Sequence, residues 1–288
     1  MRWGGAEGGV ELSRKIRYRN RIVIYALMAL VMIFFVGPIL WFILLAFRHP
    51  SEAYTIPPQL FFEPTLQSFE RTFVDPGNNR PQVFNSIIVS TGATLLSLPF
   101  AMSAAYALSR FALRGKDFIM NWYISLLIAP PIVFVIPYFI LMSRIGWAGT
   151  YQAMILTLQT LAIPFSVWLL KSFIDEVPLD LEEAAWVDGA TRLSAFFRII
   201  IPLATPGIIV TSMFTFVFSW NNVLFPLILS KGSTTTLPVG TISFFASTGV
   251  YWNQIAATAV VAMLPPMLIF LVLGRYVVRG LTFGAVKG

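Results

Sequence analysis

The strongest chemical pattern in the sequence is a group of acidic residues in and before the segment EEAAWVDGATRLSAFFRIIIP, at positions 182–202. Positions 175–188 contain no basic residue and six acids, which are Asp175, Glu176, Asp180, Glu182, Glu183 and Asp188. A segment of net negative charge predicts a partner with a basic groove. The alternative is a helix lying on the membrane, but such helices favour Lys and Arg, and anionic lipid repels acids.

Local signals in this segment predict a short helix. Pro178 suits a first helical turn, where its missing N–H leaves no bond unmade. The acids that follow would lie near the positive end of the helix dipole. The i, i+3, i+4, i+7 spacing predicts a stripe of mostly small side chains, where another backbone can approach closely. The stripe consists of Leu181, Ala184, Ala185 and Asp188.

A second helix is predicted after a tight corner. Gly189 stands just past the first helix, where glycine adopts a left-handed backbone conformation at the lowest cost. Thr191 is predicted to cap a helix that runs through Ile200. Pro202 is predicted to redirect the chain into the next apolar run.

Reactive residues elsewhere do not form a pattern typical of an enzyme. A phosphate-binding loop has the form GxxxxGK[ST], and RGKD at 114–117 lacks the first glycine and the hydroxyl. His49 is the only histidine, so no histidine pair can hold a metal, and the chain has no cysteine and no GxSxG motif. The sequence therefore predicts a chain that is not an enzyme and binds no cofactor or metal, with any ATP hydrolysed by another chain.

The elements that must position these residues are membrane spans. The 288 residues are 57% hydrophobic and 11% charged, which leaves too little polar surface to coat a soluble globule. Six apolar runs are long enough to cross a hydrocarbon core of about 30 Å as helices. They cover 22–47, 83–108, 118–142, 151–173, 203–229 and 254–274. The predicted fold class is an all-α, polytopic membrane protein with six transmembrane helices and a cytoplasmic helix pair.

Loop charge predicts the orientation of these spans. Most of the 20 Lys and Arg residues fall on one side, which is therefore assigned to the cytoplasm together with both termini. The other side carries only Arg48, Arg71, Arg80, Arg144 and Lys231. This asymmetry and contact with anionic lipid explain the net charge of +7, so no nucleic-acid partner is predicted.

The sequence predicts one domain with two tails. The cytoplasmic tails cover 1–21 and 279–288, and the six-helix transmembrane domain covers 22–278, with a coupling segment at 175–202. Residues 1–13 are rich in glycine and lack periodicity, so a mobile tail is expected there.

Two further groups have residue types suited to binding. The external loop near 230–253 carries aromatic residues that could form an interfacial belt or touch an outside partner: Phe244, Phe245, Tyr251 and Trp252. The fifth apolar run contains Ser219, Trp220, Asn221 and Asn222. Polar atoms inside a span need hydrogen-bond partners. These residues could bind the hydroxyls and pyranose faces of a sugar, or equally form hydrogen bonds to neighbouring helices.

The coupling segment resembles a known signature. Its Glu183-Ala184-Ala185, Gly189, Ile199 and Pro202 are similar to the E-A-A-x(3)-G-x(9)-I-x-L-P pattern in membrane subunits of binding-protein-dependent ATP-binding-cassette importers, with isoleucine in place of the leucine. Three further stretches resemble the second permease subunit of maltose-type carbohydrate importers. They are WNNVLFPL at 220–227, TLPVG at 236–240 and RGLTFGAVKG at 279–288.

This resemblance implies a type I importer permease in a bacterial or archaeal inner membrane. Its implied partners are a homologous second permease, two ATPase subunits that bind ATP and Mg²⁺, an external solute-binding protein that meets the loop near 230–253, and membrane lipid. The implied ATPase-docking residues are Glu182, Glu183, Ala184, Ala185, Asp188, Gly189 and Ala190. The implied ATPase contacts of the tail are Gly284, Ala285, Val286, Lys287 and Gly288.

The implied mechanism is alternating access, in which closure of the ATPases moves the helix pair as a lever. A self-contained facilitator or channel is the rival, and it leaves the acidic docking helix without a role. A disaccharide, a glycoside, a polyol and a glycerol phosphate all remain candidate solutes.

Overall fold

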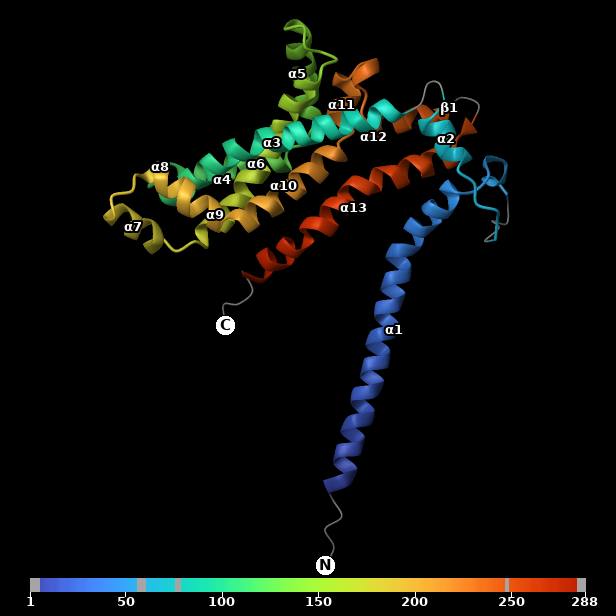
Figure 1. Ribbon diagram of the computed structural model, residues 1–288, viewed down its shortest axis with the longest axis horizontal. Coiled ribbons are helices and arrows are strands. Elements are labelled where there is room, and N and C mark those ends of the chain that lie inside the picture. The colour runs from blue at the N-terminus through green and yellow to red at the C-terminus, as the bar shows by residue number, and fades with distance from the viewer. Residues whose placement is uncertain (1–5, 56–60, 76–78, 247–248, 284–288) are drawn as a thin grey trace, which may run out of the picture. The chain divides into compact units, whose positions relative to one another are not determined.

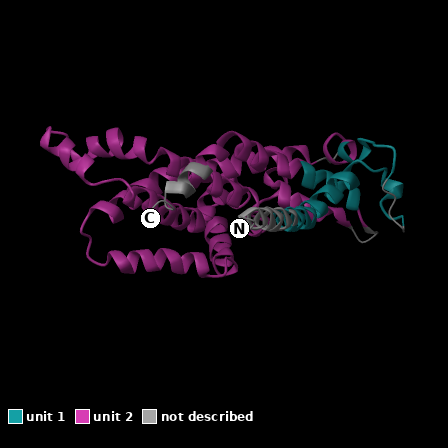
Figure 2. Cartoon of the chain, turned by 90° about the horizontal axis from the view of Figure 1, so that it is seen from below, with its two compact units in different colours: residues 1–69, 252–260 teal, residues 70–251, 261–288 magenta. Residues whose placement is uncertain are grey.

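The computed structural model describes residues 6–55, 61–75, 79–246 and 249–283. The chain divides into two compact units, coloured separately in Figure 2. Unit 1 comprises Met1–Phe69 and Trp252–Val260, and unit 2 comprises Glu70–Tyr251 and Val261–Gly288.

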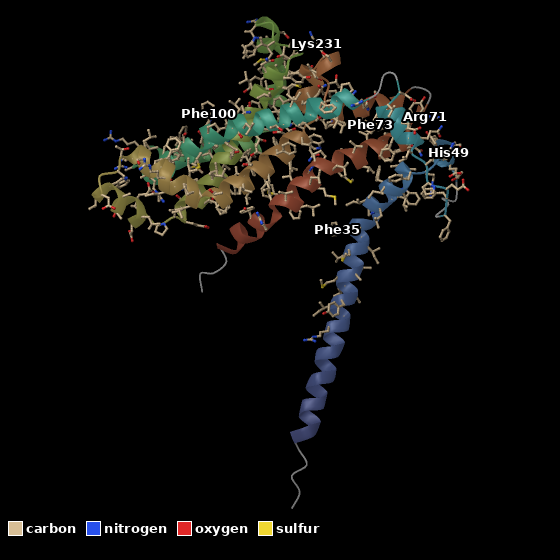
Figure 3. All side chains as sticks on the ribbon, in the orientation of Figure 1. Phe35, His49, Arg71, Phe73, Phe100 and Lys231 are labelled. Carbon is tan, nitrogen blue, oxygen red and sulfur yellow. The ribbon has the colours of Figure 1, made fainter. Side chains whose placement is uncertain are left out.

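Unit 1 is built around α1 (Ala6–Ala46), whose stretch Val23–Ala46 is long and apolar enough to cross a membrane. Side chains along its middle are exposed, as Phe35 shows in Figure 3. The short helix η1 (Pro50–Glu52) follows. Residues 6–13, where the sequence predicts a tail without periodicity, are the first turns of α1, because once the span is helical each added residue gains a backbone hydrogen bond at low cost.

The core of unit 2 consists of three helices that pack side by side: α3 (Arg80–Arg110), α6 (Tyr151–Asp175) and α10 (Thr205–Trp220) (Figure 1). Small residues on α3 allow this close approach, as is common between membrane helices. Buried examples are Ser90, Ala93, Ser97, Ala101 and Ala105. Between α6 and α10 the hydroxyls of Ser166 and Thr215 form a buried hydrogen bond of 3.0 Å.

Two of the predicted spans are broken. The run at 118–142 forms α4 (Lys116–Ile128) and α5 (Ile132–Arg144), bent by 92°, because Pro130 and Pro131 remove backbone donors and disfavour a helical residue before them. The run at 203–229 forms α10 and α11 (Leu224–Leu229), separated by 221–223. Each of these runs therefore consists of two helices with a break between them.

Outside the coupling segment, the remaining elements before the last helix are short. These short elements are α2 (Gln67–Phe73), η3 (Gly232–Thr234), α12 (Leu237–Gly240), η4 (Thr241–Phe244) and the antiparallel pair β1 (Phe245–Ala246) and β2 (Gly249–Val250). The last helix, α13 (Trp252–Phe283), continues through its two prolines, so the predicted tail at 279–288 begins as helix.

Among the described residues, four helices are long and apolar enough to span a membrane. The number rises to six if each of two bent pairs counts as one span, and these pairs are Lys116–Ile128 with Ile132–Arg144, and Arg192–Leu203 with Thr205–Trp220. The predicted fold class, an all-α membrane protein, is confirmed, with one two-residue strand pair added.

Candidate functional site

The coupling segment folds at the Arg110 end of α3 (Figure 1). There α7 (Asp180–Val187) is joined to α8 (Arg192–Ala195) through Gly189, whose φ of 86° is left-handed. The Thr191 hydroxyl accepts a hydrogen bond of 3.2 Å from the Ser194 backbone N–H. The predicted helix pair, its glycine corner and its threonine cap are therefore confirmed.

The turn into the membrane does not occur where the sequence predicts it. After α8 the chain forms the π-helical turn η2 (Phe196–Ile200) and then α9 (Ile201–Leu203). Pro202 lies inside the continuous helical stretch Arg192–Leu203, to which it contributes no backbone N–H. The bend of 72° falls after Leu203, at Ala204.

The outer face of α7 is uncovered within the described chain. The predicted stripe lies on it, with Leu181, Ala184 and Asp188 exposed and Ala185 half-buried. Exposed Glu183 adds an acid to this face, and Val187 is 88% exposed. Small side chains and a free carboxylate on a short rigid helix suit insertion into a basic groove of another protein.

Glu182 does not belong to that face. It is fully buried, and its carboxylate takes the Arg110 guanidinium at 2.5 Å and the Tyr106 hydroxyl at 2.8 Å. Its assignment as a docking residue is therefore wrong, because both carboxylate oxygens bond within the chain. Asp175 is likewise occupied, by Lys171 and the Ser109 hydroxyl, so the acidic cluster offers a partner fewer charges than the sequence suggests.

An aromatic support for the corner was not predicted from the sequence. The Arg192 guanidinium lies 4.5 Å from the ring centroid of Trp186 and 5.2 Å from that of Phe111. These cation–π contacts fix α8 against α7 and the end of α3. Sequence reasoning missed them because Phe111 is far from the pair along the chain.

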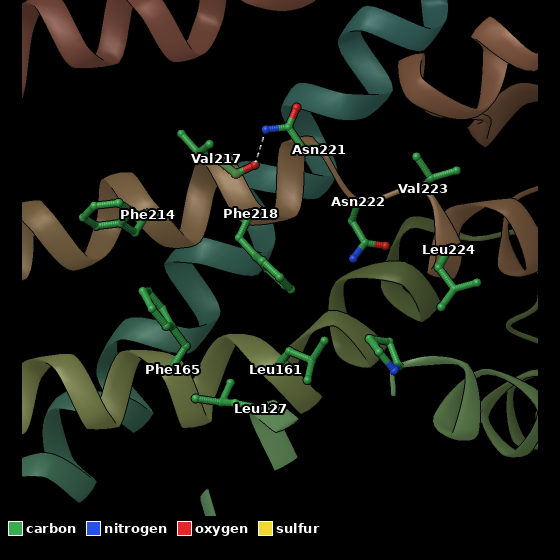
Figure 4. A pocket seen from close by; sticks show the side chains of 11 residues that line it. Leu127, Leu161, Phe165, Phe214, Val217, Phe218, Asn221, Asn222, Val223 and Leu224 are labelled. Carbon is green, nitrogen blue, oxygen red and sulfur yellow. Dashed lines mark hydrogen bonds between the residues drawn. The ribbon is translucent and has the colours of Figure 1, made fainter. Parts of the chain in front are cut away.

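A cavity of about 740 Å³ lies between α4, α6 and α10, next to the break that separates α10 from α11 (Figure 4). Its walls are mostly apolar, with the rings of Phe165, Phe214 and Phe218 and the side chains of Leu127 and Leu161. Aromatic faces and a few amides are the lining that a small organic molecule with both apolar and polar surfaces would need.

The four predicted pathway residues separate into two pairs. Asn221 and Asn222 line the cavity, where the Asn221 amide donates to the Val217 carbonyl and the Asn222 side-chain oxygen caps the Phe225 N–H. Ser219 and Trp220 are buried outside its lining, and the Trp220 indole N–H donates to the Ala262 carbonyl at 3.0 Å. Of the two alternatives predicted for Trp220, contact with a sugar or a hydrogen bond to a neighbouring helix, the structure therefore shows the hydrogen bond to a neighbouring helix.

The aromatic residues of the loop near 230–253 also separate. Phe244 is buried, whereas Phe245, Tyr251 and Trp252 are exposed. The tail residues at 284–288 lie outside the described part of the chain. Within the described residues no group of three or more metal-ligating side chains occurs.

Candidate membrane spans, a short helix uncovered at one end of the core and a cavity beside broken spans are features expected of a membrane transport subunit. The chain belongs to the family described as binding-protein-dependent transport system inner membrane component, which it matches over residues 97–283. The family predicted from the coupling segment is therefore confirmed.

Named relatives cover nearly the whole chain. A probable ABC transporter permease of Sinorhizobium fredii is 34% identical over 96% of this chain and 98% of its own length. The trehalose/maltose transport system permease of Thermococcus litoralis is 32% identical over 91% of this chain and 94% of its own. Among solved structures, a bacterial ABC transporter for import of alginate aligns with a TM-score of 0.73 at 18% identity, covering 91% of this chain and 98% of that one, and so shares the fold.

Proposed function

We propose that this chain is one permease subunit of an ATP-binding-cassette importer for a sugar or sugar-like solute, delivered by an external binding protein. The observation that carries the proposal is the uncovered face of α7, which offers Glu183 and a small-residue surface beside a fixed corner at Gly189. The family membership, the trehalose/maltose relative and the alginate importer fold support the same activity.

The energy for transport comes from partner chains in this proposal. Two ATPase subunits bind ATP and Mg²⁺, and the exposed residues of α7 with Gly189 and Ala190 dock into a groove of one of them. Residues 284–288 are proposed as a further ATPase contact, and a homologous second permease completes the translocation pathway. Arg192 holds α8 against α7 at this corner by lying over the Trp186 ring, and Thr191 caps the start of α8.

The proposed orientation follows from the loop charges. The α7 corner and both termini lie in the cytoplasm, and the loop at 230–253 faces outward in a bacterial or archaeal inner membrane. The exposed rings of Phe245, Tyr251 and Trp252 are then available to the binding protein.

The cavity is proposed as this chain's part of the sugar pathway. Aromatic rings stack on pyranose faces, and Asn221 is exposed with an amide able to reach a hydroxyl. Replacing Asn221 with Leu should raise the KM for sugar uptake about 2- to 12-fold, since one hydrogen bond contributes about 0.5–1.5 kcal/mol. Ser125→Ala, an exposed hydroxyl on α4 outside the cavity, is the matched control.

The decisive test is uptake by the complete complex in proteoliposomes. Radiolabelled trehalose and maltose are supplied with the purified binding protein, with and without ATP inside. The proposal predicts uptake that needs both ATP and the binding protein, and its loss in Glu183→Arg, which places a cation on the docking face. Uptake that continues without ATP would establish the facilitator instead.

A further inference from the structure

The outer end of α3 holds an external segment by buried side-chain hydrogen bonds. The Asn85 amide nitrogen donates to the carbonyls of Ser233 at 2.9 Å and Thr235 at 2.7 Å, and Asn85 is 3% exposed. The neighbouring Ser86 hydroxyl accepts the Leu237 backbone N–H at 2.8 Å. Residues 231–240, here called the outer segment, are therefore attached to the first turns of α3.

The other end of α3 holds the start of the coupling segment in the same way. Residues 175–182, here called the inner segment, run from the last residue of α6 into α7. The Ser109 hydroxyl donates to Asp175 and the Arg110 guanidinium donates to the Val177 carbonyl at 2.7 Å. The buried Glu182 carboxylate takes Arg110 and the Tyr106 hydroxyl.

Between these two attachments α3 is one unbroken helix. It has 31 residues and stays helical through Pro99. At 1.5 Å of rise per residue, the stretch from Asn85 to Arg110 spans about 37 Å. It packs against α6 and α10, and rigid packed elements of this kind are one means by which distant sites are coupled.

Both attachments resist being broken. Moving the outer segment away from α3 would leave the two Asn85 donors buried without acceptors, and buried unpaired polar groups are costly. Separating Glu182 from Arg110 would leave two buried charges unpaired, which is costlier still. A displacement of either segment therefore moves α3 rather than leaving it behind.

We propose that α3 is the link through which the outer segment and the inner segment change position together, with Asn85 and Arg110 as its positioning residues. This inference rests on the proposed function, in which the outer segment meets the binding protein and α7 meets the ATPase. The helix α6 is joined to the inner segment through the chain, but a turn at 176–179 follows it. Arg110 holds that turn at the Val177 carbonyl and the first turn of α7 at Glu182, so α3 determines the direction of α7.

The test uses the complete importer in lipid nanodiscs, with ATPase rate measured with and without loaded binding protein. Asn85→Leu removes the outer attachment. Arg110→Met combined with Glu182→Leu removes the inner attachment without leaving one charge unpaired. Asn253→Leu is the matched control, because Asn253 is 4% exposed and also donates to two carbonyls, Leu45 and Arg48, but in unit 1.

Stimulation by the binding protein should fall about fivefold or more in each test variant and stay unchanged in Asn253→Leu, while the basal ATPase rate persists in all of them. Combining the outer and inner changes should lower stimulation no further than either alone, because both interrupt one link. Additive losses, or full stimulation in Asn85→Leu, would overturn the inference.

A failure of the proposed function has a different signature. In that case the unsubstituted complex itself shows no stimulation by any binding protein. Where Asn85→Leu does not assemble, Asn85→Asp decides the matter, because it keeps the acceptor for the Tyr151 hydroxyl but loses both amide donors. Normal stimulation in Asn85→Asp would contradict the proposal, and reduced stimulation with faster hydrogen–deuterium exchange at the inner segment would support it.

Discussion

At the scale of single residues, two adjacent glutamates have opposite environments. Successive residues of a helix point about 100° apart, so the turn of α7 that buries Glu182 against Arg110 leaves Glu183 exposed. Their chemical identity is the same, and only the side of the helix differs. Glu182 therefore holds α7 in place, and Glu183 is the one that a partner can reach.

Alanine substitution should separate these two roles. Glu182→Ala leaves the Arg110 guanidinium buried without a counter-charge and should lower the free energy of unfolding by about 3–5 kcal/mol. Glu183→Ala should change it by no more than about 0.5 kcal/mol, because the side chain is exposed, yet weaken ATPase binding. Denaturant unfolding in detergent micelles and ATPase co-purification measure the two effects. Equal loss of stability in both variants would contradict the buried ion pair.

At the scale of elements, interruptions of helices create the features that matter for transport. Pro130 and Pro131 end α4, and residues 221–223 end α10, so polar backbone and the amides of Asn221 and Asn222 occur beside the cavity. Irregular backbone at membrane depth is tolerated where it lines a cavity or is buried in protein. The corner at Gly189 is also a break between two helices, but it lies outside the core helices and leaves the outer face of α7 exposed.

Substitutions at two glycines with open space around them can test whether the stability of the Gly189 corner depends on its backbone conformation. A Cβ added to Gly189 or to Gly37 meets nothing within 4 Å, but only Gly189 has a left-handed φ, of 86°. Gly189→Ala should destabilise the corner by about 1–2 kcal/mol, seen as faster hydrogen–deuterium exchange over 180–195. Gly37→Ala, inside α1, should be neutral or stabilising by up to about 1 kcal/mol. Unchanged exchange in Gly189→Ala would show that the corner tolerates other conformations.

At the scale of the whole molecule, the described surface carries far more apolar area than water tolerates. Side chains such as Phe35 at 67% and Ile128 at 77% exposure need lipid or another subunit around them. The loop charges predict that the α7 end of unit 2 faces the cytoplasm, since cations are retained on that side.

This orientation can be tested with single cysteines, because the natural chain has none. Lys231 and Val187 are both exposed at the surface, one beside η3 and the other at the end of α7. In intact cells a membrane-impermeant maleimide should label Lys231→Cys and leave Val187→Cys unlabelled until the membrane is permeabilised. The reverse pattern would invert the proposed topology and place α7 outside the reach of any ATPase.

The sequence by itself determined the class of fold, the helix pair with its corner, and the family. The spans can be predicted because the thickness of the bilayer sets the length of an apolar helix. The corner can be predicted because Gly189 and Thr191 act on their own backbone and on their nearest neighbours in the chain. The signature at 183–202 was equally local and led to the family that the comparison confirms.

Only the tertiary structure decided which of the candidate residues face a partner. Glu182 is buried because Arg110, 72 positions earlier in the chain, lies opposite it, and Trp220 avoids the cavity because Ala262 accepts its N–H. The rings of Phe165 and Phe214 look like ordinary span residues in the sequence, yet they form the cavity wall. These outcomes depend on which helices pack together, and neither hydrophobic periodicity nor local capping encodes contacts between residues so far apart along the chain.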